Sequence, residues 1–220
     1  QNEKVCIAPL IYLELRVTWA QRVRWVKKQN EPGETVKLFI RLNRPETDIT
    51  VNDGRIDLNY EVPLRPTYER RGYDDTAAMK KDGKIDQAEV AERTQSVNTG
   101  SQPFEDEHGK GLSLDLPITE EGSGTKWRLV WAAHTDVNLM EVRGTPARFR
   151  YVRHWPTLDS VMEEAVANRD DNLAHSRRFE KLLEQAPLVQ SRRHLIAQGF
   201  QSYLSNTFWC DVADGTEWFS

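Results

Sequence analysis

The stretch IYLELRVTW, residues 11–19, decides the fold of the first part of the chain. Its apolar side chains recur at every second position, at Ile11, Leu13, Leu15, Val17 and Trp19. Successive side chains of a β-strand point to opposite faces, so this period predicts a strand with one buried face.

The same period returns four more times before about residue 151. The alternating apolar positions are Val36, Leu38, Ile40 and Leu42, then Ile56, Leu58, Tyr60 and Val62, then Leu112, Leu114, Leu116 and Ile118, and finally Trp127, Leu129 and Trp131. Turn residues separate the runs at positions 31–33, 52–54 and 122–124. Many short strands with such turns between them predict an antiparallel β-sandwich over residues 1–155.

Residues 68–110 interrupt this pattern and are predicted to form a long insertion, with a short helix over Gln87–Thr94. The sequence KDGKIDQAE, residues 81–89, resembles the second half of a calcium-binding EF-hand loop, with Asp82, Asp86 and Glu89 at ligand positions. The alternative is a turn followed by a helix whose N-terminus is capped by Asp86. Because Ala78 and Lys80 would occupy the first two ligand positions, the capped helix is the favoured interpretation.

The hydrophobic period changes to 3.6 residues after Thr157. Thr157 is a predicted helix N-cap, and an amphipathic stripe then continues to about Gln185, before Pro187. A second amphipathic helix is predicted over about Ser191–Asn206. The chain is therefore predicted to be a β-sandwich followed by α-helices.

Composition excludes several classes of function. The formal net charge is -4 and the basic residues form no stripe, so nucleic-acid binding is not expected. No apolar run is long enough to cross a membrane. The five histidines show no metal-ligand spacing, no cofactor motif is present, and neither metal nor cofactor is expected. Cys6 and Cys210 are predicted to be buried thiols rather than a disulfide.

The closing segment carries the most specific chemistry. Aromatic faces stack on sugar rings, and acidic side chains bond sugar hydroxyls. Both kinds are gathered at Trp209, Asp211, Asp214, Glu217 and Trp218. The alternative is that the two tryptophans belong to the core and the acids surround a turn at Gly215.

The amino-acid sequence of this segment resembles the start of the catalytic domain in glycoside hydrolase families 116 and 52. The resemblance is carried by AQGFQSYLSNT, residues 197–207, then by Asp214-Gly215 and by Trp218-Phe219. Family 116 includes the non-lysosomal glucosylceramidase type of β-glucosidase, and family 52 includes β-xylosidases. In these families linking helices join an N-terminal β-sandwich to an (α/α)6 barrel.

The resemblance implies three parts and a carbohydrate substrate for the full-length protein. These are a sandwich over residues 1–155, a linker helix over 156–187, and the first helix and turn of an (α/α)6 catalytic domain over 188–220, with the rest of the barrel as a missing partner. Asn206, Thr207 and Trp218 would lie near the substrate.

The resemblance also implies that the chain contains no catalytic residue. The family nucleophile belongs to a Glu-Gly pair a few residues after the tryptophan, so it is expected beyond Ser220. Glu217 precedes Trp218 and does not match it. The expected function is that of an inactive fragment of a retaining β-glycosidase.

Two alternatives stay open. One is a different sandwich-plus-(α/α)6 enzyme, such as a glucoamylase-like hydrolase or a disaccharide phosphorylase. The other is a non-catalytic carbohydrate-binding sandwich. The fragment interpretation predicts that the apolar stripe on residues 191–206 is exposed, because its neighbours would lie elsewhere in the protein.

Overall fold

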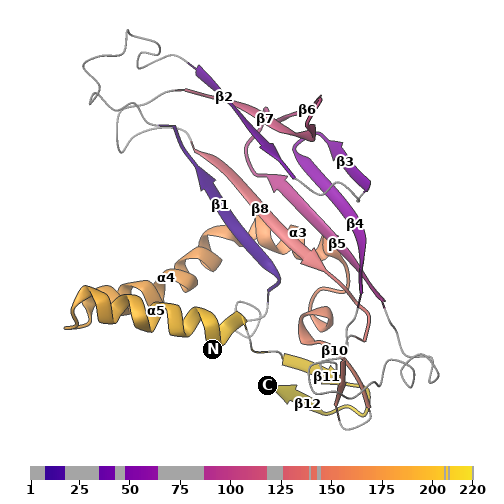
Figure 1. The fold of residues 1–220 in the computed structure, drawn as a ribbon, viewed down its shortest axis with the longest axis vertical. Coiled ribbons are helices and arrows are strands. Elements are labelled where there is room, and N and C mark those ends of the chain that lie inside the picture. The colour runs from indigo at the N-terminus through magenta and orange to yellow at the C-terminus, as the bar shows by residue number, and fades with distance from the viewer. Residues whose placement is uncertain are drawn as a thin grey trace. The chain divides into compact units, whose positions relative to one another are not determined.

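The computed structural model describes residues 8–17, 35–42, 48–63, 87–117, 126–138, 140–142, 145–205, 207 and 209–219. These residues form three antiparallel sheets and three α-helices (Figure 1). The chain divides into two compact units. One contains Leu10–Tyr60 and Val90–His134, and the other contains Gln1–Pro9, Glu61–Glu89 and Thr135–Ser220.

The largest sheet has five strands in the order β1-β8-β5-β4-β3. The strands are β1 (Leu10–Leu15), β3 (Asp48–Asn52), β4 (Arg55–Pro63), β5 (Gln87–Ser96) and β8 (Trp127–His134). Between β3 and β4 the chain reverses at a turn whose last residue, Gly54, has a φ of 74°, a conformation that favours glycine. The strands predicted around Ile56 and Trp127 and the predicted turn are thus confirmed. β1 is a strand as predicted, but the predicted buried face is wrong, because Ile11, Leu13 and Leu15 are 52%, 42% and 38% exposed.

A second sheet has three strands in the order β2-β7-β6. Its strands are β2 (Thr35–Arg41), β6 (Gln102–Asp106) and β7 (Gly109–Pro117). The register of β2 and β7 pairs Leu38 with Leu114 and Ile40 with Leu112, so the alternating apolar residues of both strands share one face.

The two sheets contribute to one hydrophobic core. Its buried members are Ile56 and Leu58 on β4, Leu112, Leu114 and Leu116 on β7, and Trp127 and Leu129 on β8. The indole nitrogen of Trp127 donates to the Ser96 hydroxyl at 3.0 Å, which satisfies the one polar atom of this large buried side chain. Two antiparallel sheets around a common core are compatible with the predicted β-sandwich.

The predicted helix over Gln87–Thr94 is wrong, because these residues belong to strand β5 at the centre of the five-stranded sheet. Pairing with β8 along Ala91–Ser96 supplies the backbone hydrogen bonds that a local helix would otherwise provide. The predicted insertion therefore does not extend to residue 110. Asp82 and Asp86 lie outside the described residues. Glu89 lies on β5, so the helix of both the capping-box and the EF-hand interpretations is missing there.

The second unit contains the helices and a four-stranded sheet. The sheet has the order β12-β11-β10-β9 and joins β9 (Met140–Val142) and β10 (Thr145–Phe149) to β11 (Trp209–Val212) and β12 (Glu217–Phe219). A 3₁₀-helix, η2 (Arg150–Arg153), follows β10 directly. The sequence pattern did not predict strands after residue 157. β11 pairs with β10 across about sixty intervening residues, and β12 pairs with β11.

The predicted long helix is divided into α3 (Leu158–Ala167) and α4 (Arg169–Gln185) at Asn168. Thr157 caps α3 as predicted, with its hydroxyl accepting from the Ser160 amide at 3.2 Å. α5 (Gln190–Ser205) matches the second predicted helix. Among the described helices, none has the length and apolar character that crossing a bilayer requires.

The apolar stripe of α5 is largely exposed, as the fragment interpretation predicts. Leu195 is 68% exposed and Tyr203 is 52% exposed. Phe200 contacts Phe179 of α4, with ring centroids 4.2 Å apart, and still remains 40% exposed. The (α/α)6 barrel and the boundaries of the three predicted parts stay predictions.

Candidate functional site

The candidate site is built on the sheet β9–β12 and on η2, all within the second unit. Strands β11 and β12 form a hairpin in which Asp211 lies opposite Glu217 and Trp209 lies opposite Phe219. Its turn contains Gly215 at φ 88°. The acidic and aromatic residues predicted to form a sugar-binding turn thus lie on a regular β-hairpin.

The hairpin places the predicted cluster on two faces. In the register, Trp218 lies opposite Cys210, whereas Trp209, Asp211 and Glu217 occupy the alternate positions. Because cross-strand partners share a face and neighbours alternate, Trp218 projects from the face opposite to the other three. The predicted single cluster is therefore split.

Arg150 holds the face that contains Asp211. Its Nη1 lies 2.8 Å from Oδ1 of Asp211 and 2.7 Å from Oε1 of Glu217. The Arg150 side chain is only 8% exposed, and its Cζ lies 4.7 Å from the centroid of the Trp209 ring. A buried guanidinium is stable only when it is paired, and two carboxylates and an aromatic face supply that pairing here.

Around this Arg150 cluster, defined as Arg150, Trp209, Asp211 and Glu217, the polar groups are also paired. Arg153 reaches Glu217 at 3.9 Å from the solvent side. Asp214, at the turn, accepts from the hydroxyl and the amide of Thr216, and these hydrogen bonds lower the pKa of its carboxyl. The turn is therefore held by its own side chains.

On the other face of the hairpin the β11 side chains are buried, whereas Trp218 on β12 is 38% exposed. Cys210 and Val212 pack with Ala147 in a small core, and burial raises the pKa of the Cys210 thiol to about 11, with a further contribution from Asp211. This confirms that Cys210 is a buried thiol, whereas Cys6 lies outside the described residues. The thiolate is strongly disfavoured, so Cys210 is no nucleophile at neutral pH.

Tyr151 anchors η2 next to this core. Its hydroxyl donates to the Thr135 carbonyl oxygen at 2.9 Å and accepts from the Thr135 amide at 2.9 Å. Burial raises the pKa of the phenol, and the ring stacks on Phe149 at 5.7 Å. These contacts fix the chain immediately before and after Arg150.

The hairpin brings two carboxyl groups close together. Asp211 and Glu217 lie within hydrogen-bond distance of the same nitrogen, Nη1 of the buried Arg150. The prediction that Glu217 is not the nucleophile stays a prediction.

Of the predicted substrate-proximal residues, Trp218 lies on β12 and is 38% exposed, and Thr207 is half-buried just before β11. Asn206 lies outside the described residues.

Sequence reasoning missed Arg150, because nothing distinguishes it from Arg148 or Arg153 before the pairing of β10 with β11 is known. Over the part of the chain that the structure describes, no three His, Cys, Asp or Glu side chains form a metal site.

Comparison with known proteins identifies the class of this segment. Residues 118–219, which include β8 to β12, match the model of glycosyl hydrolase family 52. The resemblance to glycoside hydrolases is thereby confirmed for family 52, and this segment is family 52-like. No curated protein matches the chain.

Proposed function

We propose that this chain is the N-terminal region of a β-glycosidase that hydrolyses β-xylosides or β-glucosides with retention of configuration. The observation that carries the proposal is the family 52 match over residues 118–219, which overlaps the segment AQGFQSYLSNT and the hairpin that follows it. The three predicted parts, residues 1–155, 156–187 and 188–220, belong to the same proposal, with the last as the beginning of an (α/α)6 barrel.

Within this proposal the hairpin β11–β12 positions the chain that follows it. The Arg150 cluster ties the hairpin to η2 through two ion pairs, and Cys210 and Val212 bury its other face. A catalytic carboxylate must be held within a fraction of an ångström of its productive position, and rigid strands do this better than loops. The Glu-Gly pair expected soon after Phe219 would follow directly on this rigid hairpin, which would hold it in position.

Asn206, Thr207 and Trp218 are proposed to lie near the substrate. Thr207 and Asn206 connect α5 to β11, and Trp218 presents an exposed indole on the face of the hairpin opposite the Arg150 cluster. An exposed indole next to a catalytic carboxylate would stack on the apolar face of a sugar ring. The proposed role of these residues is to position the substrate.

The 220 residues alone are proposed to be inactive. Asp211 and Glu217, the two carboxylates that the hairpin brings together, are both bound by Arg150. The resemblance places the nucleophile after Phe219 and the acid/base residue much further along. Hydrolysis with retention requires both groups.

The test begins with the next 20 or so codons of the source gene. A Glu-Gly pair within them is the expected result, and a stop codon directly after Ser220 would contradict the proposal. The gene product that includes these codons and any following domain should release nitrophenol from 4-nitrophenyl β-xyloside or β-glucoside.

Two controls test whether hydrolysis depends on the glutamate of the Glu-Gly pair. Replacing the glutamate of the Glu-Gly pair with glutamine should reduce kcat by at least about a thousandfold, since a covalent nucleophile is lost. The 220-residue chain measured at the same concentration should release no nitrophenol. Activity of the 220-residue chain, or full activity of the glutamine variant, would contradict the assignment.

A further inference from the structure

A groove lies along β3 and β6, the neighbouring edge strands of the two sheets of the first unit. It consists of two adjoining depressions, of about 590 and 410 Å³, that share Val51 and Pro103 in their walls. One extends to the β3–β4 turn and the other to the β6–β7 turn. The two depressions therefore form one continuous open channel at the edge of the sandwich.

The middle of this groove is apolar. Ile49 and Val51 are partly buried and pack against the hydrophobic core. On β6, Pro103 lines both depressions and Phe104 lines one of them. Phe104 is held in place by Phe39, whose ring meets it edge-on with centroids 4.9 Å apart.

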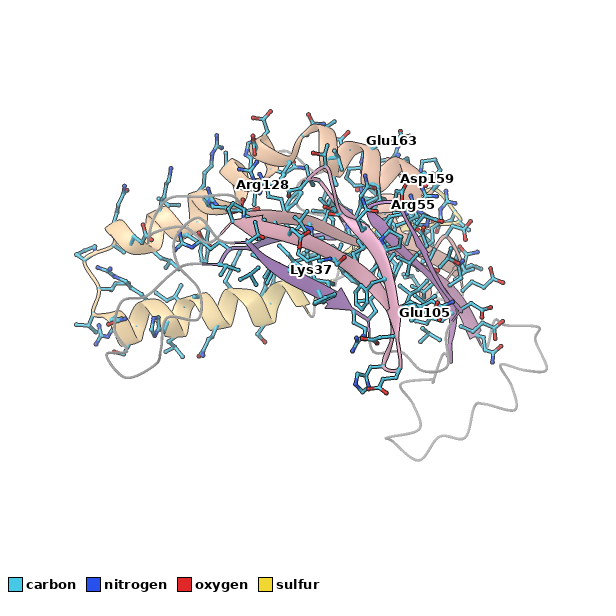
Figure 2. The ribbon with its side chains drawn as sticks, turned by 90° about the horizontal axis from the view of Figure 1, so that it is seen from above. Lys37, Arg55, Glu105, Arg128, Asp159 and Glu163 are labelled. Carbon is cyan, nitrogen blue, oxygen red and sulfur yellow. The ribbon has the colours of Figure 1, made fainter. Side chains whose placement is uncertain are left out.

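The two ends of the groove are polar and carry both charges. Asn52, Asp53, Arg55 and Gln95 line one end. Glu105 and Lys110 line the other and lie 3.9 Å from each other. Arg55 and Glu105 are both labelled in Figure 2. Each end thus combines hydrogen-bond donors with acceptors. Arg55 also lies 3.2 Å from the carboxylate of Asp57, so both cations of the groove have a carboxylate partner.

This pattern favours an uncharged ligand with many hydroxyl groups. A phosphate-rich ligand such as a nucleic acid needs an excess of positive charge. Here Arg55 is already paired with Asp57 and Lys110 with Glu105, so the groove offers no such excess. Side-chain amides and cations donate hydrogen bonds to hydroxyl groups, and amides and carboxylates accept hydrogen bonds from them. The apolar middle offers Val51, Pro103 and Phe104 to the C–H faces of sugar rings.

We infer that the groove between β3 and β6 is a binding site for a neutral oligosaccharide. The choice of an oligosaccharide rests partly on the proposed glycosidase function, since such an enzyme meets these chains. The combined size is within the range of ligand sites, and an open channel accepts a chain that continues beyond it at either end.

The test uses the isotopically labelled 220-residue chain with xylotetraose and with cellotetraose. Amide shifts in an NMR titration are expected at residues 49–55, 95 and 103–110. The Asn52→Ala/Gln95→Ala double variant removes two amides from one end and should weaken binding at least about tenfold. The Glu105→Gln/Lys110→Gln variant should weaken it similarly from the other end.

The matched control is Lys37→Ala. Lys37 lies on β2, outside the lining of the groove, with a side chain that is 54% exposed (Figure 2). Binding should be unchanged in this variant. Unchanged denaturation midpoints in all variants would show that lost binding is not lost folding.

Three results would overturn the inference. They are the absence of shifts at about 10 mM of either tetrasaccharide, shifts confined to other parts of the chain, and equal binding by the groove variants and the control. Binding of a sulfated oligosaccharide in place of both neutral ones would also overturn it. If the longer gene product is active but no oligosaccharide binds in the groove, only this inference is overturned. If an oligosaccharide binds in the groove but the longer gene product is inactive, only the proposed function is overturned.

Discussion

Arg150 donates to Asp211 at 2.8 Å, although the two residues are 61 positions apart in the sequence. The contact joins η2 to the hairpin β11–β12, and Glu217 adds a second ion pair to the same nitrogen. The closing hairpin is therefore tied to a segment that precedes all three α-helices. Three of the predictions below concern this hairpin and its contact with Arg150.

Arg150→Met should destabilise the protein by about 3–5 kcal/mol, because it leaves the Asp211 carboxylate, 22% exposed, without its buried cation. The free energy of unfolding from urea denaturation measures the effect. Arg153→Ala is the control, since Arg153 is 58% exposed and 3.9 Å from Glu217, and it should change stability by less than about 1 kcal/mol. Equal effects of the two substitutions would show that burial of Arg150 is unimportant.

Cys210 should produce an alkaline loss of stability. Its folded pKa of about 11 lies above the ordinary value of 9.0, so the folded state holds the proton more tightly. The contribution is complete below pH 9 and is lost as the pH rises from 9 to about 11. In Cys210→Ala, unfolding free energies measured across this window should fall less steeply than in the wild type. Parallel curves would contradict the assignment.

Asp214 should contribute in the opposite direction. Hydrogen bonds from Thr216 lower its pKa in the folded state, so its contribution is present above the ordinary value of 3.8 and disappears as the pH falls through the lowered one. Thermal midpoints of Asp214→Asn should therefore depend less on pH below about pH 4. Thr216→Val should reduce the dependence in the same way, and an unchanged acid limb in both variants would contradict it.

Two glycines should respond in opposite directions to alanine. A Cβ at Gly111 would lie 2.1 Å from the Ile40 carbonyl oxygen and 2.8 Å from Phe104, so Gly111→Ala should cost about 3 kcal/mol or more. Nothing lies within 4 Å of a Cβ at Gly199, on α5. Gly199→Ala should instead stabilise the protein by about 0.5–1 kcal/mol, measured by the same denaturation. Similar losses in both variants would contradict the packing around β7.

The N-terminus of α3 offers a local test. Thr157 accepts from the Ser160 amide, and the Ser160 hydroxyl donates back to the Thr157 carbonyl oxygen at 2.7 Å. Thr157→Ala should cost about 1 kcal/mol in unfolding free energy, whereas Thr157→Asp should restore most of it, because an aspartate also caps. If Thr157→Asp loses as much unfolding free energy as Thr157→Ala, the threonine stabilises this site by packing rather than by capping.

The strands β1, β2, β4, β7 and β8 could be predicted from the sequence because each alternates apolar and polar residues over its own length. β2 and β7 are examples, with Leu38 paired with Leu114 as the shared face requires. β5 could not be predicted. Its buried face includes Glu92, Thr94 and Ser96, whose polar side chains hide the period of two. Only its position between β8 and β4 explains why they are buried.

The candidate site was predictable as a set of residue types and not as an arrangement. Trp209, Asp211 and Glu217 do share a face, as a sugar-binding cluster would require, yet Arg150 is bound among them and Trp218 lies on the other face. A local pattern cannot show a partner that lies some 60 positions away. The groove at β3 and β6 was invisible for the same reason.

The sequence by itself determined the strands β1, β2, β4, β7 and β8, the helical character of the chain after Thr157 and the resemblance of the closing segment to glycoside hydrolases. The hydrophobic period and the residues of a motif are local properties, so a single segment of the chain is enough to identify them. The tertiary structure alone decided that β11 pairs with β10, that Arg150 is buried between two carboxylates, and that β3 and β6 border a groove. These relationships depend on register between distant strands, which no single segment encodes.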